Sequence, residues 1–161
     1  MWSDWNCLEN TTRVWGFAFE NALSPEICEN VLTDLFPFME AWESHQMPVM
    51  ASAQWYHNRF LFIAGGDEKL NVSGCGIDAM RSNVIAVLSK HNLDPLEAGI
   101  VVWTDLEDNW HLCRWMETSV NYRERMKQSA SAIYSPIPLT IAELRLSWPL
   151  KPSQSALLVM N

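Results

Sequence analysis

The order of hydrophobic patterns between residues 13 and 105 constrains the fold of this chain more than any other feature. Alternating apolar and polar residues predict a strand, whereas apolar residues at intervals of three and four predict a helix. The run Phe60–Ala64 is apolar throughout, which predicts a central strand buried on both faces. The predicted elements, in order, are a strand at 13–19, a helix from about 25 to His45, strands at 49–56 and 60–64, a helix at about 76–91 and a strand at 100–104.

This β-α-β-β-α-β order is that of the split βαβ unit, so we predict an α+β, ferredoxin-like core over about 13–105. Such a core is an antiparallel sheet with two helices on one face; another small α+β sandwich with a different strand order is the alternative. The 161 residues suit one domain, with an N-terminal arm at 1–12 and a C-terminal extension at 106–161 that extends the sheet and covers an edge. The extension is expected to contain a strand at 110–114, a helix near 117–128 and a short helix that starts from a capping box at Thr140 and Glu143.

Charge and composition indicate which classes of partner and which cellular location to expect. Acidic residues outnumber basic ones by 19 to 11, giving a net charge of −8 that disfavours a nucleic-acid partner. No apolar run approaches the roughly 20 residues of a membrane span, and residues 1–10 lack the basic start of a secretory signal. The four cysteines form no Cys-x-x-Cys pair, so we expect reduced thiols in a cytoplasmic protein. Nine tryptophans supply apolar area for a core or for a partner surface, and we expect the arm with Trp2 and Trp5 to fold back on the sheet.

The segment Ser73-Gly74-Cys75-Gly76-Ile77-Asp78 places a thiol between two glycines where a loop enters a helix. Free N–H groups at a helix start attract an anion and lower the pKa of a cysteine located there. Cys75 is therefore a candidate thiolate, with Ser73, Gly74 and Gly76 as candidate binding residues. The alternative is a capping turn in which Ser73 or Asp78 satisfies the helix start and Cys75 is a small buried apolar residue.

The predicted topology brings a base toward this thiol. In a ferredoxin-like fold the end of the first helix and the start of the second share one edge, which places Trp42 and His45 near Cys75. The candidate catalytic set is then Cys75 as nucleophile, His45 as base and Asp78, or Glu43, as the group that orients the imidazole. Alternatively, His45 interacts with the last carbonyls of its own helix.

Other motifs for cofactors are absent from the sequence. His111 and Cys113 share a strand face but lack zinc-site spacing, so no metal is expected. The chain has neither a phosphate loop nor a dinucleotide fingerprint, and no cofactor is expected. The basic cluster Arg123, Arg125 and Lys127 is interpreted as a solvated helix face.

Several of these pieces together resemble a family of small bacterial proteins of similar length. The family has no established activity, and its members often carry the label of an ABC transporter ATPase. The matching pieces are Trp15, Trp42-x-x-His45, Arg59-Phe60, the run 73–78 and Trp148-Pro149-Leu150.

The chain departs from the family pattern at three places. Gln46 stands where the pattern has glycine, Gly76 stands where it has serine, and Pro149 follows Trp148 directly. The resemblance implies a single intracellular domain and names no substrate. The ATPase label conflicts with the missing nucleotide loop.

Three functions remain open from the sequence. The first is a binding or interaction domain whose pocket is lined by Trp42, His45, Ser73, Cys75 and Asp78 and holds a small anion or an acidic group of a protein partner. The second is a cysteine-dependent enzyme that uses Cys75 and His45. The third is an assembly subunit that forms a homo-oligomer or larger complex through a tryptophan-rich surface.

Overall fold

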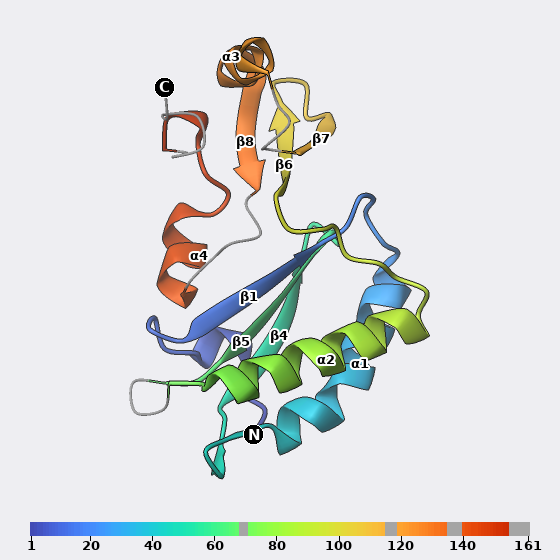
Figure 1. Ribbon diagram of the computed structural model, residues 1–161, viewed down its shortest axis with the longest axis vertical. Coiled ribbons are helices and arrows are strands. Elements are labelled where there is room, and N and C mark those ends of the chain that lie inside the picture. The colour runs from blue at the N-terminus through green and yellow to red at the C-terminus, as the bar shows by residue number, and fades with distance from the viewer. Residues whose placement is uncertain (68–70, 115–118, 135–139, 155–161) are drawn as a thin grey trace.

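The computed structural model describes residues 1–67, 71–114, 119–134 and 140–154. The molecule is an elongated α+β structure with a three-stranded sheet and its helices at one end and a second three-stranded sheet at the other (Figure 1). The elements in chain order are η1 (Trp5–Cys7), β1 (Arg13–Ala18), α1 (Pro25–Ala41), β2 (Glu43–Ser44), β3 (Met47–Pro48), β4 (Ala51–Tyr56), β5 (Phe60–Gly65), α2 (Gly74–Lys90), β6 (Ile100–Asp105), β7 (Trp110–Arg114), α3 (Val120–Ser129), β8 (Ala130–Tyr134), α4 (Ile141–Ser147) and η3 (Pro152–Gln154).

The first sheet has the order β1-β5-β4, and both strand pairs are antiparallel. Every residue of the central strand β5 is buried, as the unbroken apolar run predicts. The turn between β4 and β5 contains His57 and Asn58, whose φ angles of 53° and 50° lie in the left-handed region that a tight hairpin turn needs. The strand predictions for this part of the chain are confirmed.

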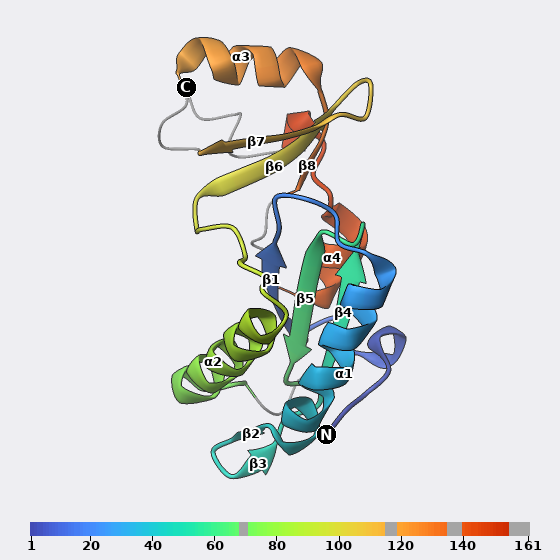
Figure 2. The same cartoon turned by 90° about the vertical axis from the view of Figure 1, so that its right-hand side faces the viewer.

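The helices α1 and α2 lie side by side on one face of this sheet (Figure 1, Figure 2). Ser24 Oγ accepts a hydrogen bond from the Ile27 N–H at 3.3 Å and caps α1. The helix ends at Ala41 rather than near His45, because Trp42 adopts an extended conformation and leads into the hairpin of β2 and β3. The core between the helices and the sheet includes Val31, Leu35, Leu61, Ile63, Met80 and Val84.

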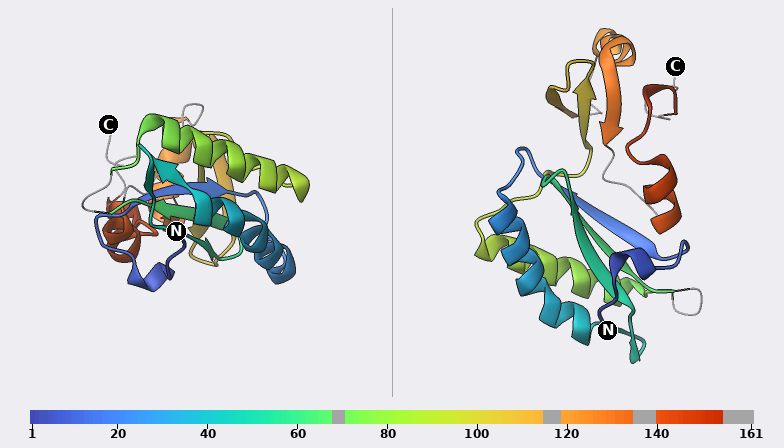
Figure 3. Two further views of the ribbon diagram at one scale, coloured as in Figure 1. Left: turned by 90° about the horizontal axis from the view of Figure 1, so that it is seen from below. Right: turned by 180° about the vertical axis from the view of Figure 1, so that it is seen from behind.

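The opposite face of the first sheet is covered by the N-terminal arm, α4 and residues of the second sheet. From behind, α4 lies on the side of the sheet opposite to α1 and α2 (Figure 3). Trp5 of the arm is buried and contacts the Tyr56 ring, with centroids 6.4 Å apart. The prediction that the arm folds back is therefore confirmed. The capping box is confirmed too, because Thr140 Oγ1 accepts a hydrogen bond from the Glu143 N–H at 3.2 Å.

The second sheet changes the predicted topology. β6 pairs with β7 on one side and with β8 on the other, and both pairs are antiparallel. A ferredoxin-like core would place β6 beside β1, so the α+β class is confirmed but the four-stranded βαββαβ sheet over 13–105 is not. The edge of β1 is occupied instead by other residues. The Leu96 N–H donates to the Ala18 carbonyl at 2.8 Å, and Arg13 forms an antiparallel bridge with Thr140.

The extension contains the predicted strand at 110–114, and its helix α3 begins at Val120. The expected start of that helix, near residue 117, lies outside the described residues. Strand β8 was not predicted. None of the helices in the described ranges is both long and apolar enough to cross a membrane.

Candidate functional site

The two segments predicted to share an edge are in contact. Ser73 is the N-cap of α2, and its Oγ accepts a hydrogen bond from the Gly76 N–H at 3.2 Å. Ser44 of β2 donates to Ser73 Oγ at 3.1 Å and accepts from the Ser73 N–H at 2.9 Å. These bonds fix the start of α2 to the chain that follows α1, and they form the predicted capping turn.

Trp42 and Gly76 complete this contact inside the core. The Trp42 side chain is buried, and its Nε1–H donates to the Gly76 carbonyl at 3.1 Å. Gly76 is also buried: a Cβ there would lie 3.0 Å from Val72 Cγ1. These two candidate binding residues therefore hold α2 against the first sheet.

The candidate catalytic residues lie on the surface near this contact. His45 is exposed in the turn between β2 and β3, with φ of 54°. Cys75 is exposed in the first turn of α2 rather than buried, and Asp78 is exposed on the same helix. Among the described residues, no side-chain hydrogen bond joins any two of these three. The structure thus brings the backbone segments together without forming a thiol–imidazole pair.

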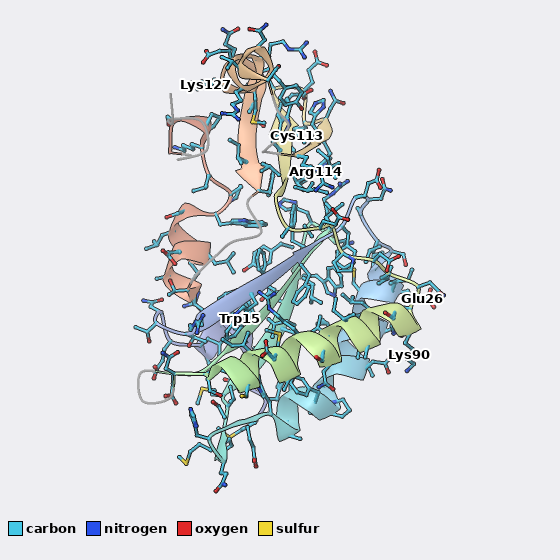
Figure 4. The ribbon with its side chains drawn as sticks, in the orientation of Figure 1. Trp15, Glu26, Lys90, Cys113, Arg114 and Lys127 are labelled. Carbon is cyan, nitrogen blue, oxygen red and sulfur yellow. The ribbon has the colours of Figure 1, made fainter. Side chains whose placement is uncertain are left out.

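A cavity lies elsewhere, between the second sheet and α3. Its volume is about 260 Å³. Figure 4 labels Cys113 on β7 and Lys127 on α3, in the part of the molecule that contains it. The cavity combines three aromatic rings, a carboxylate, a guanidinium and a hydroxyl, and its lining residues are Trp103, Asp105, His111, Tyr122, Arg125, Met126 and Ser129.

The sheet wall of the cavity is built from the register of β6 and β7. Trp103 pairs across the strands with His111, so both side chains point to the same face, and their rings stack with centroids 4.2 Å apart. Asp105, two residues after Trp103, faces the same way and lies 2.8 Å from His111 Nε2 through its Oδ2. The imidazole is therefore held by a ring on its face and a carboxylate on its edge.

The Asp105 carboxylate is well supplied with hydrogen-bond donors. Besides His111, it accepts bonds from the backbone N–H groups of Glu107 and Asn109, both at 2.9 Å, and from the Asn109 side chain. The hydrogen bond from His111, followed by those from the turn, holds the pKa of Asp105 far below its usual range. Asp105 therefore stays ionised and fixes the β6–β7 turn.

The helix wall of the cavity comes from α3. Tyr122 accepts a hydrogen bond from Trp103 Nε1 at 3.4 Å, which ties the helix to β6. The Arg125 guanidinium lies over the Tyr122 ring, 5.7 Å from its centroid. Nearby Cys113 has its pKa raised by burial, so this thiol stays protonated at neutral pH.

Sequence reasoning missed this cavity although it identified parts of it. It placed His111 and Cys113 on one strand face and Arg125 on a solvated helix face. The pairing of Trp103 with His111 was not predicted. The turn at Asp105–Asn109 could have indicated it, because two strands joined by a short turn usually form a hairpin. The strand at 100–104 was assigned to the first sheet, so its pairing with the strand at 110–114 was not considered.

The tryptophans, the cysteines and possible metal ligands were the other candidates for function. None of the eight described tryptophans is exposed, and Trp115 lies outside the described residues. The four cysteines are free. In the part of the chain that the structure describes, no group of three His, Cys, Asp or Glu side chains could hold a metal ion.

Comparisons with protein-family models, with curated proteins and with solved structures found no match to this chain. The resemblance to the small bacterial family stays a prediction.

Proposed function

We propose that this chain is a small-ligand binding domain whose binding site is the cavity between β6, β7 and α3. The observation that carries the proposal is a cavity of about 260 Å³ lined by three aromatic rings together with charged side chains. Ligand sites in proteins combine apolar and aromatic walls with a few well-placed polar groups, which is the composition found here.

Two polar side chains of this cavity, His111 and Tyr122, are held in place before any ligand arrives. His111 is fixed by Trp103 and Asp105, and Tyr122 is fixed by Trp103. Preorganised groups lower the entropic cost of binding, because fewer side chains must be ordered. The turn at Ser73–Gly76 has fewer polar groups available to a ligand, because the Ser73 hydroxyl and the Gly76 N–H already form hydrogen bonds within the protein.

A fragment screen by two-dimensional NMR tests this proposal. We expect the fragments that bind to shift the Trp103 indole N–H signal and the backbone signals of His111, Tyr122 and Met126. A Ser129→Phe variant should abolish these shifts, because Ser129 lines the cavity and the larger ring would fill it.

The matched control is Gln128→Phe, which adds the same ring at an exposed position one residue earlier on α3. It should leave fragment binding intact. The proposal is wrong if no fragment shifts the cavity signals, or if the shifts persist in Ser129→Phe.

Two expectations from the sequence accompany this proposal. The four free cysteines support a reducing, cytoplasmic location. The second expectation is that a protein partner with an acidic group binds the surface around Cys75, which is exposed.

A further inference from the structure

We infer that the ligand of the β6–β7–α3 cavity is a small planar acid: a single aromatic ring that carries one carboxylate or phosphate group. This inference rests on the proposed function, since it names the class of ligand for the same site. Three features of the cavity support it: its size, its aromatic walls and its balance of charge.

The size of the cavity suits a ligand of about one ring. The cavity volume of about 260 Å³ lies just below the range of roughly 300–1,000 Å³ for sites of drug-sized molecules. A six-membered ring with one short acidic substituent suits a cavity of this volume.

The walls favour a flat, aromatic ligand. Trp103, His111 and Tyr122 contribute three rings to the lining, and Met126 contributes a thioether. Aromatic rings interact favourably with one another in offset and edge-to-face arrangements, and sulfur contacts ring edges well. A saturated ring of the same size lacks these electrostatic preferences and should bind less tightly.

The charges favour an acidic group near Arg125. The oxygens of Asp105 accept hydrogen bonds from His111, Glu107 and Asn109, so this carboxylate is already satisfied within the protein. The Arg125 guanidinium lies over Tyr122, and among the described residues it has no carboxylate partner. A guanidinium matches the geometry of a carboxylate or phosphate through paired hydrogen bonds. Within the described part of the chain, Arg125 is thus the group lining this cavity that has no anionic partner.

An NMR titration of the intact chain with four probes tests the ligand class. The probes are benzoate, phenyl phosphate, benzamide and cyclohexanecarboxylate, and the readout is the Trp103 indole N–H signal. For a ligand this small we expect a Kd on the order of 1 mM for benzoate or phenyl phosphate. Benzamide, which lacks the charge, and cyclohexanecarboxylate, which lacks the planar ring, should each bind about tenfold more weakly.

The variant Arg125→Gln should weaken benzoate binding about tenfold, because it removes a charge-assisted hydrogen bond. Its control is Arg81→Gln, which makes the same change of charge at an exposed site on α2 and should leave the Kd unchanged. Both variants replace exposed side chains, and their backbone spectra report whether the fold is kept.

The results separate the two proposals. If benzamide binds as tightly as benzoate, or if Arg125→Gln leaves the Kd for benzoate unchanged, the ligand class is wrong while the binding site stands. If none of the four probes shifts the Trp103 signal but other fragments do, the ligand class is again wrong. If no compound of any kind shifts it, the proposed function fails as well.

Discussion

Replacing Gly65 with alanine tests how tightly the Trp42 ring closes the core beside the start of α2. A Cβ at residue 65 would lie 2.4 Å from Cζ3 and 2.7 Å from Cη2 of Trp42, and 3.2 Å from Val49 Cγ1. Gly65 has an ordinary strand conformation with no positive φ. The cost of the substitution therefore comes from the collision and not from the backbone.

The Trp42 ring cannot move aside freely, because its Nε1–H donates to the Gly76 carbonyl at 3.1 Å and its side chain is buried. Overpacking of a core costs about 1–3 kcal/mol, and loss of the hydrogen bond would add about 1 kcal/mol. The lower entropy of the unfolded alanine chain returns about 0.5–1 kcal/mol. We therefore expect Gly65→Ala to lower the free energy of unfolding by about 2 kcal/mol, and the Tm by roughly 4–8 °C.

Urea denaturation of a double-mutant cycle measures this effect and its cause. The cycle contains Gly65→Ala, Trp42→Phe and the double variant. Because the phenylalanine ring is shorter, Gly65→Ala should cost at least about 1 kcal/mol less in the Trp42→Phe background. The control is Gly74→Ala, where a Cβ meets nothing within 4 Å. A Gly65→Ala protein as stable as the parent, or a cycle without coupling, would show that residue 65 and the Trp42 ring do not collide.

Three further predictions concern titratable groups. Cys75 is exposed, whereas Cys28 is buried and burial raises its pKa, so a thiol reagent at neutral pH should modify Cys75 much faster than Cys28. Mass spectrometry of the two peptides measures the rates, and equal rates would contradict this difference in burial. The pKa of Asp105 is lowered chiefly by the His111 hydrogen bond, so its contribution to stability is present above the ordinary value of 3.8 and is lost as the pH falls below it. Between about pH 5 and about pH 2, Asp105→Asn should therefore lose less unfolding free energy than the parent does. Denaturant titrations of both proteins at the two pH values measure this difference. The pKa of His57 is lowered by partial burial and then by Arg59, so the unfolded chain binds a proton more readily and stability should fall as the pH drops below 6.5. His57→Asn, which tolerates the positive φ, should flatten this pH dependence, and an unchanged slope would count against the lowered pKa of His57.

Much of the first sheet could be predicted because its signals are local. The unbroken apolar run of β5 indicates a strand buried on both faces. Asn58, which tolerates positive φ, indicates the turn before it. The capping box at Thr140 likewise fixes the start of α4. Each of these features depends on neighbours within a few residues.

The placement of β6 could not be predicted, because it depends on distant partners. The strand itself is confirmed, but its pattern does not show whether it pairs with β1 or with β7 and β8. Leu96 and Thr140 occupy the edge of β1, and neither carries a signal for this in its local sequence. The hairpin of β2 and β3 was missed for another reason. His45 and Gln46 both have positive φ, and they are not the asparagine and glycine residues that usually mark such a turn.

The contact between two distant segments was predicted, whereas the cavity was not. The meeting of residues 42–44 with residues 73–76 follows from the order of strands and helices, and the hydrogen bonds between Ser44 and Ser73 confirm it. Topology alone does not fix side-chain geometry, and the exposed His45 and Cys75 show no bond to each other. The cavity requires both the Trp103–His111 pairing and the position of α3 above it, so it became visible only in three dimensions.

A crystal structure of the protein grown with benzoate is the sharpest test of ligand binding in the cavity. We expect density for the ligand in the cavity, with its ring among Trp103, His111 and Tyr122 and its carboxylate within hydrogen-bond distance of Arg125. Density at the turn of Ser73 and Cys75 instead, or a cavity that holds only water at a benzoate concentration well above the measured Kd, would contradict it.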